Sequence, residues 1–174
     1  MRRTIIALTA LGAVLIAPAT LPAGAGNRVT CTIVGTQGDD RLIGTPRRDV
    51  ICGRGGDDFI KGRRGNDILF GQDGRDIIIG GPGRDLIHGG DGADIIDGNG
   101  GGDTLHGDSQ ADLLRGFGGP DELYGGTERD CLYTVDGVGG NDLANGGPGN
   151  ADRYDVDPGD TVVNAEVVGS CAGD

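Results

Sequence analysis

Aspartate recurs every nine residues along most of this chain, and each aspartate holds the same place in a glycine-rich unit. Eleven consecutive units run without a slip from Gly35 to Tyr133, each beginning with Gly and carrying Asp at its sixth position. The aspartates are Asp40, Asp49, Asp58, Asp67, Asp76, Asp85, Asp94, Asp103, Asp112, Asp121 and Asp130. Carboxylate oxygens at flexible distances are the ligands that calcium prefers. These eleven side chains are therefore the candidate metal ligands.

The residues around each aspartate indicate how these ligands are positioned. The first six positions of a unit are rich in glycine and suit a turn with positive φ angles, whereas the last three are apolar or bulky and suit a short strand. Leu or Ile stands two residues after every aspartate. Two units then make one coil, and residues eighteen apart stack at one strand spacing, about 4.8 Å. Bare carboxylates at that distance repel, and a divalent cation between coils removes the repulsion.

The nine residues from Gly89 to Asp97, Gly-Gly-Asp-Gly-Ala-Asp-Ile-Ile-Asp, match a known repeat, G-G-x-G-x-D-x-U-x with U a large apolar residue. On this motif, the chain resembles the haemolysin-type, or repeats-in-toxin, calcium-binding family over residues 35–133. The resemblance implies an all-β, right-handed parallel β-roll, a β-solenoid with two repeats per coil and calcium between the turns. In that family, aspartate carboxylates and turn carbonyls from successive coils share each ion.

Carried over to this chain, the resemblance pairs aspartates one coil apart. The strongest expected pairs are Asp58 with Asp76, Asp67 with Asp85, Asp76 with Asp94, and Asp85 with Asp103. Three units depart from the family pattern, because Arg47, Gln110 and Glu128 replace the glycine of the fourth position. Calcium sites at those three turns are the least expected. Several calcium ions per chain are expected in all.

The chain ends predict export and two caps around the repeats. Arg2 and Arg3, the apolar run of residues 5–16 and the small residues before Asn27 are typical of a secretory signal over residues 1–25. The run is shorter than the roughly 20 residues of a membrane anchor. We expect a capping strand over 26–34, the repeats over 35–133, degenerate repeats over 134–157 and a C-terminal cap over 158–174. Secretion to the extracellular space follows from the signal.

The degenerate region still carries traces of the repeat. Asp142 falls in the sixth position of a further unit, whereas Asp152 comes one residue late. Residues 160–168 look like a strand without the repeat pattern and are interpreted as the cap. The roll is expected to continue raggedly into this region.

Charge and cysteines narrow the functional class. A formal net charge of −12 makes nucleic acid and anionic membranes poor partners. Four cysteines in an exported chain indicate disulfides. Their positions at the two ends of the repeats predict Cys31 with Cys52 and Cys131 with Cys171. The first pair requires an irregular first strand, since a regular register would hold those two residues apart.

A short motif and two histidines offer chemistry other than calcium binding. Gly107-Asp108-Ser109 looks like the nucleophile block of an esterase family, so a secreted hydrolase using Ser109 with a histidine is the alternative function. The same three residues also fit the repeat, and we expect no enzyme. His88 and His106 occupy outward ninth positions eighteen residues apart and should stack, either as two solvated histidines, which we favour, or as a weak transition-metal site.

These observations predict a secreted calcium-binding repeat protein whose β-roll folds on calcium and acts as an extracellular structural, adhesive or interaction module. Apolar residues also fill many outward seventh positions, such as Phe59, Ile77 and Ile95. Such a band usually marks a contact surface, although strand propensity alone could produce it. The expected partners are calcium ions and a cell-surface or self-association partner, without nucleic acid or membrane insertion.

Overall fold

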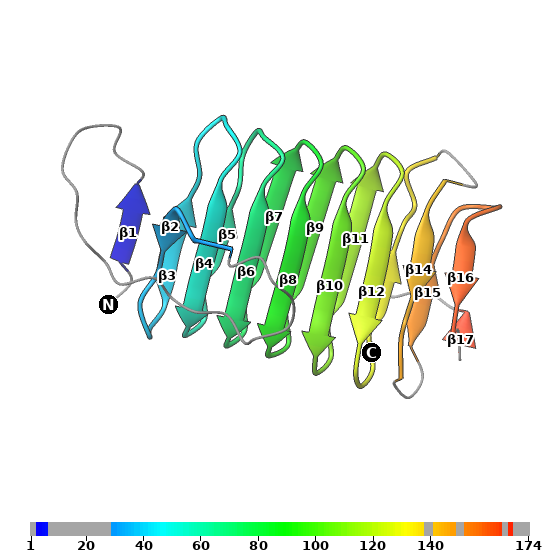
Figure 1. Ribbon diagram of the computed structural model, residues 1–174. Coiled ribbons are helices and arrows are strands. Elements are labelled where there is room, and N and C mark those ends of the chain that lie inside the picture. Colours follow the sequence, from blue (N-terminus) through cyan, green and yellow to red (C-terminus); the bar gives the residue numbers. More distant parts are fainter. Residues whose placement is uncertain (1–2, 7–28, 138–140, 149–151, 165–166, 169–174) are drawn as a thin grey trace.

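The protein is a stack of flattened coils made of two facing parallel sheets (Figure 1). The computed structural model describes residues 3–6, 29–137, 141–148, 152–164 and 167–168. All the regular elements within these ranges are β-strands, and every paired neighbour is parallel. This confirms the all-β parallel β-roll predicted from the nine-residue period.

The odd-numbered strands form one sheet and the even-numbered strands form the other, because each unit adds one strand and successive units alternate between the sheets. The first sheet has the order β1 (Arg3–Ile6), β3 (Asp40–Ile43), β5 (Phe59–Lys61), β7 (Ile77–Pro82), β9 (Ile95–Gly100), β11 (Leu113–Gly118), β13 (Cys131–Tyr133), β15 (Arg153–Asp155) and β17 (Val167–Val168). The second contains β2 (Ile33–Val34), β4 (Val50–Gly55), β6 (Ile68–Asp73), β8 (Leu86–Asp91), β10 (Thr104–Ser109), β12 (Glu122–Gly126), β14 (Leu143–Asn145) and β16 (Thr161–Val163), in this order.

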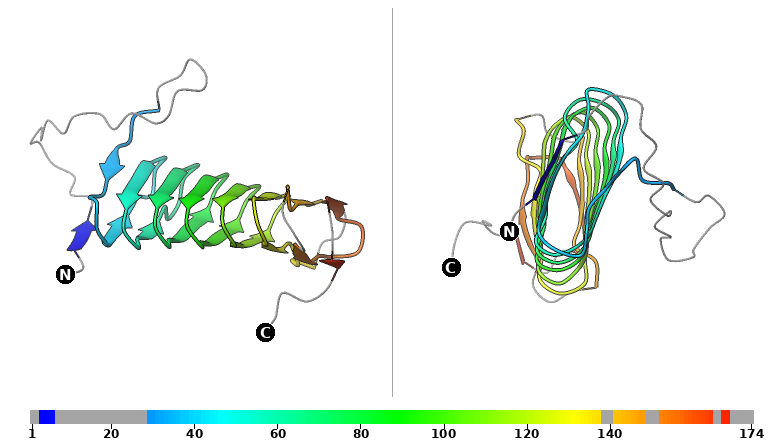
Figure 2. Two further views of the ribbon diagram at one scale, coloured as in Figure 1. Left: turned by 90° about the horizontal axis from the view of Figure 1, so that it is seen from below. Right: turned by 90° about the vertical axis from the view of Figure 1, so that its left-hand side faces the viewer.

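The register between coils is eighteen residues, as the repeat predicts. Ile78 pairs with Ile96 in the first sheet, and Leu69 pairs with Ile87 in the second. Seen along the stack, the repeat coils superpose closely (Figure 2, right). Equivalent positions of the repeat therefore form straight columns along the molecule.

The core is a single column of apolar side chains between the two sheets. The eighth-position residues, which are Leu or Ile in every unit, are 0% exposed. They are Leu42, Ile51, Ile60, Leu69, Ile78, Ile87, Ile96, Leu105, Leu114, Leu123 and Leu132. Strand alternation then turns the seventh and ninth positions outward, and most of these are half-buried by their stacked neighbours.

Beyond Tyr133 the stack continues with longer turns. Ala144 and Tyr154 take the core position in β14 and β15. Strands β16 and β17 then extend the two sheets by pairing with β14 and β15. Residues 160–168, interpreted from sequence as one strand-like cap, thus contain two short strands in the continuing sheets.

At the other end, β2 is two residues long and pairs with β4. The chain before it leaves the coil, which brings Cys31 to Cys52 in a disulfide with a Cα–Cα distance of 6.0 Å. This confirms the first predicted pair and the irregular first strand that it requires. Cys131 is also disulfide-bonded, but Cys171 lies outside the described residues, so the second pair stays a prediction.

Strand β1 lies within the predicted signal and pairs with β3. Residues 1–2 and 7–25 of that segment lie outside the described residues, as do residues 165–166 and 169–174 of the predicted cap. Across the ranges that the structure describes, no helix is long and apolar enough to span a membrane.

Candidate metal centre

The sixth-position aspartates form two buried columns, one leading into each sheet. Asp58, Asp76 and Asp94 stand before β5, β7 and β9, and the aspartates of the intervening units stand before the even-numbered strands. All eleven predicted ligands are buried, with exposed fractions between 1% and 7%. The structure therefore brings each column together as the repeat predicts.

One carboxylate oxygen of each stacked aspartate is already hydrogen-bonded. The backbone N–H of Asp58 donates to Oδ1 of Asp76 at 2.8 Å, and the N–H of Asp76 donates to Oδ1 of Asp94 at 2.7 Å. The same bond recurs in both columns from Asp40 and Asp49 onward. The stacked carboxylates are therefore not fully bare, since every coil provides a backbone donor for one carboxylate oxygen of the next.

The other oxygen, Oδ2, is buried without a hydrogen-bond partner among the described residues. This holds for Asp58, Asp67, Asp76, Asp85, Asp94, Asp103, Asp112, Asp121, Asp130, Asp142 and Asp152. A buried charged oxygen without a partner is costly. Accordingly, burial raises the pKa of Asp76 to about 7 and that of Asp112 to about 8, and neighbouring aspartates add to the rise. Each such oxygen favours a proton or a cation.

Glycine at the first position makes room for these oxygens. A Cβ on Gly71 would lie 2.1 Å from Oδ2 of Asp76 and 2.6 Å from the carbonyl oxygen of Gly89. Gly71 has no positive φ, so it is needed here for space rather than for backbone freedom. Two oxygens from successive coils thus converge beside the bare Cα. An oxygen-only donor set suits calcium, so the residues present fit that ion.

The turns themselves use positive φ at their second and fourth positions. At the fourth position, Gly74 has φ 123° and Gly92 has φ 148°. Gln110 and Glu128 adopt the same region, at φ 74° and 80°, although neither is a glycine. Their two turns therefore keep the backbone of the repeat, whereas Arg47 is outside this region and its turn differs.

The first two units are built differently from the rest. Thr45 donates its backbone N–H and its hydroxyl to Oδ2 of Asp49, at 2.6 and 2.9 Å. Thr36 makes the same two hydrogen bonds to Oδ2 of Asp40. The protein itself thus satisfies the oxygens that the other units leave without partners. All eleven aspartates belong to the predicted ligand set, and the sequence signal that sets these two apart is threonine at the second position, which occurs in these two units only.

The columns also extend further than the predicted ligand set. The N–H of Asp121 donates to Oδ1 of Asp142 at 2.8 Å, and that of Asp130 donates to Oδ1 of Asp152 at 2.9 Å. These partners are 21 and 22 residues apart, so the longer turns absorb the inserted residues. The distance from the preceding glycine already indicates Asp142, whereas the signal for Asp152 is the core residue two positions later, Tyr154.

The residues of the alternative hydrolase do not form a triad in the hydrogen bonds that the structure describes. His88 Nδ1 contacts Oδ2 of Asp108 at 3.0 Å, which is an acid and base pair. The described hydrogen bonds join Ser109 to neither histidine; its backbone carbonyl accepts from the N–H of Gly92. The two histidines do stack, as their spacing predicts.

Sequence comparison agrees with this architecture. The sequence profile of the RTX calcium-binding nonapeptide repeat, in four copies, matches residues 34–69, 70–105 and 97–130. The chain belongs to this RTX calcium-binding repeat family, and its repeats bind calcium. A search of curated proteins finds no match.

Proposed function

We propose that the protein is secreted, that its roll folds when several calcium ions occupy the aspartate columns, and that the folded roll is an extracellular structural, adhesive or interaction module. The columns of buried Oδ2 atoms without hydrogen-bond partners carry this proposal. A protein that folds without a cation would have to protonate these groups or bury their charge. Calcium supplies the compensating charge.

The proposed ligands are the aspartates whose Oδ2 has no protein donor, from Asp58 to Asp130, together with Asp142 and Asp152. Carbonyl oxygens of first-position glycines such as Gly89 lie close enough to take part. Asp40 and Asp49 belong to the predicted set, but Thr36 and Thr45 already occupy their Oδ2 atoms. We expect these two to contribute least.

Export is supported by the signal-like residues 1–25 and by the disulfide between Cys31 and Cys52, a bond typical of oxidising compartments. Strand β1 belongs to the segment that export would remove. Its loss leaves β3 as an edge strand with unpaired backbone groups. Such an edge is a template for strand addition by another chain.

The outward seventh positions are the other candidate contact surface. Ile77 is 43% exposed, whereas Phe59 and Ile95, on the strands either side, are half-buried. The apolar band is therefore less exposed than the alternation suggests, because stacked side chains cover one another. As an interaction module, the roll would use this face only after folding.

Three measurements test this function. Calorimetric titration of residues 26–174 with calcium should show several ions per chain, and the N-terminal sequence of protein recovered from the medium should begin near Gly26. A single weak ion, or an intact Arg2-Arg3 start on exported protein, would contradict the proposal.

For the contact surface, sedimentation should show a calcium-dependent assembly that is lost when Ile77 and Ile95 are replaced by Thr. A wild-type chain that stays monomeric and binds no surface partner would remove that part.

A further inference from the structure

The outer face of the even-numbered sheet carries a ladder of four aromatic rings, at the ninth position of every second unit and thus in successive coils. Phe70 stacks on His88 with ring centroids 5.5 Å apart, His88 on His106 at 4.4 Å, and His106 on Tyr124 at 4.8 Å. The two imidazole planes differ by only 3°. Stacking alone needs no nitrogen, as Phe70 and Tyr124 show at the outer rungs. The two central rungs nevertheless both carry metal-ligating nitrogens.

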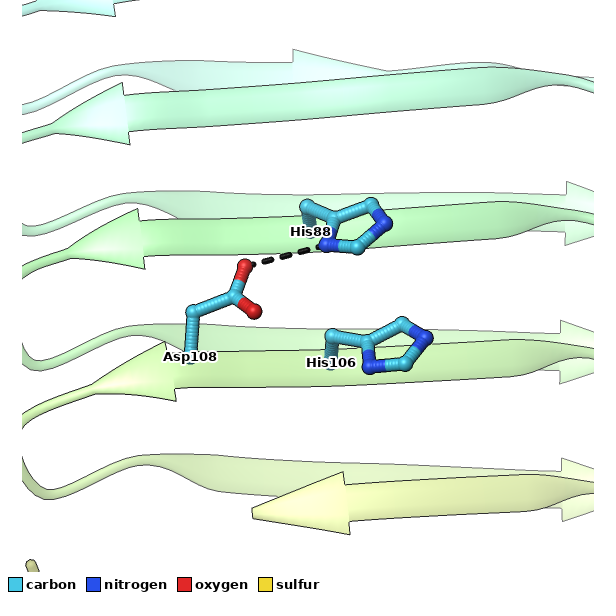
Figure 3. A group of neighbouring side chains, drawn as sticks. All are labelled: His88, His106 and Asp108. Carbon is cyan, nitrogen blue, oxygen red and sulfur yellow. Dashed lines mark hydrogen bonds and ion pairs between the residues drawn. The ribbon is translucent and has the colours of Figure 1, made fainter. Parts of the chain in front are cut away.

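A carboxylate joins this pair from an unusual backbone position. Asp108 has φ 75°, and the residues in register with it on the neighbouring strands are the glycines Gly90 and Gly126. Aspartate tolerates a positive φ better than most residues. Among the second positions of the repeat units from Gly35 to Tyr133, however, aspartate occurs only at Asp108, in the coil that contains His106. Its Oδ2 lies 3.0 Å from Nδ1 of His88, on the same side of the sheet as both rings (Figure 3).

We propose that His88, His106 and Asp108 together bind one transition-metal ion of the zinc, copper(II) or nickel class. One ligand atom from each of the three side chains lies within 4.8 Å of the other two. The side chains of His88 and Asp108 are 31% and 40% exposed, so water can complete the coordination. Two imidazoles and one carboxylate with an open position form a donor set typical of zinc.

The rearrangement needed for binding is small. Ligand atoms around a tetrahedral zinc ion at 2.0–2.1 Å are separated by about 3.3 Å. The pair formed by His88 and Asp108 already meets this distance. Only the His106 ring has to approach, by tilting out of its parallel stack. Phe70 and Tyr124 pack on the outer faces of the two imidazoles and limit other movements.

This site differs from the calcium columns in place and in chemistry. The aspartate columns are buried at the strand starts and offer oxygen only, whereas the cluster lies on the outer sheet face and offers nitrogen, which suits zinc and copper rather than calcium. Metal binding also requires a neutral imidazole and an ionised carboxylate. Burial and the neighbouring His88 lower the pKa of His106. Burial opposes the ionisation of Asp108, but the hydrogen bond to His88 and the charges of both histidines together lower the pKa of Asp108.

Nuclear magnetic resonance of the imidazole ring C–H groups is a direct test, because the chain contains only 2 histidines. The protein is first folded in saturating calcium, verified by circular dichroism, and then titrated with zinc alone. Both imidazole signals should shift together and saturate at one equivalent. Signals that do not move would overturn the proposal, and so would signals that move without saturating at one equivalent. Because calcium is saturating and the fold is verified first, such a failure leaves the calcium-dependent function untouched.

Three variants separate the site from general effects. His88→Phe keeps the aromatic ladder, and Asp108→Gly installs the residue found in both neighbouring coils, so each removes one ligand while retaining the fold. Each should weaken zinc binding by about 10-fold or more. Asp91→Asn removes a nearby exposed charge without touching the cluster and should leave the affinity unchanged. Equal zinc affinity in all three variants and the wild type would place the ion elsewhere and refute the site.

Discussion

Replacing Asp76 by Asn should have opposite effects with and without calcium. Asn retains an oxygen to accept the N–H of Asp58, but it removes the charge at the unpartnered Oδ2. Burial raises the pKa of Asp76 from 3.8 to about 7 in the metal-free roll. At pH 8, above both the folded and the unfolded pKa, ionised Asp76 therefore destabilises the metal-free fold by about 4 kcal/mol. Asp76→Asn removes that cost in chelator.

In calcium the same substitution removes a ligand. Asp76 stacks between Asp58 and Asp94, so it contributes to the ions on both of its sides under the proposed function. An ion held at a hundred times its dissociation constant stabilises the fold by about 2.7 kcal/mol. Losing one or two such ions should therefore destabilise the calcium-bound roll by about 3–5 kcal/mol.

The assay is unfolding by denaturant in calcium, and folding induced by osmolyte in chelator, both followed by circular dichroism at pH 8. Asp49→Asn is the matched control. One oxygen of Asp49 accepts hydrogen bonds from Thr45, and Asn can supply that oxygen. The free energy of unfolding should therefore change by no more than about 1 kcal/mol in calcium or in chelator. If Asp76→Asn destabilised the fold equally in chelator and in calcium, the unpartnered oxygen would have no role toward a cation.

Three further predictions test the surroundings of the columns. Gly71→Ala places a methyl group against Oδ2 of Asp76 and should destabilise the calcium-bound roll by about 1–3 kcal/mol, measured by unfolding in urea. Gly38→Ala should be nearly neutral, because a Cβ there meets nothing within 4 Å. Equal effects of the two variants would contradict the argument that Gly71 is needed for space. In chelator, protonation of the buried aspartates, whose pKa values are raised to between about 6 and about 8, stabilises the roll in acid, and this stabilisation is lost as the pH rises through those values. The β content should therefore increase from pH 8 to pH 5, while calcium affinity falls. A flat pH profile in both measurements would refute the burial of these groups. Peptide mapping without reduction should recover Cys131 joined to Cys171, and a bond from either to Cys31 or Cys52 would contradict an extended roll.

The nine-residue period was enough to predict the fold and the main columns. Because the spacing of Asp and of Leu or Ile never slips between Gly35 and Tyr133, it dictates which side chains stack and which face the core. The eighteen-residue register and the buried core column follow from that spacing alone. The period does not, however, specify the partners of individual atoms.

What the sequence left open depends on local hydrogen bonds and turns. The hydroxyls of Thr36 and Thr45 donate to the carboxylates of Asp40 and Asp49, which are contacts that a nine-residue pattern does not encode. Asp152 comes one residue late in the count and still joins its column, because a longer turn absorbs the insertion without moving the following strand. The contact between His88 and Asp108 depends on the positive φ of Asp108, which was not predicted from its residue type.

Circular dichroism of residues 26–174 during a calcium titration tests the central proposal most directly. We expect little β structure in chelator at pH 8 and a cooperative gain of β structure in millimolar calcium. Magnesium should substitute poorly, because it requires a stricter octahedron and releases its waters reluctantly. A complete β spectrum in chelator at pH 8, unchanged by calcium, would contradict the proposal that calcium compensates the buried aspartate columns.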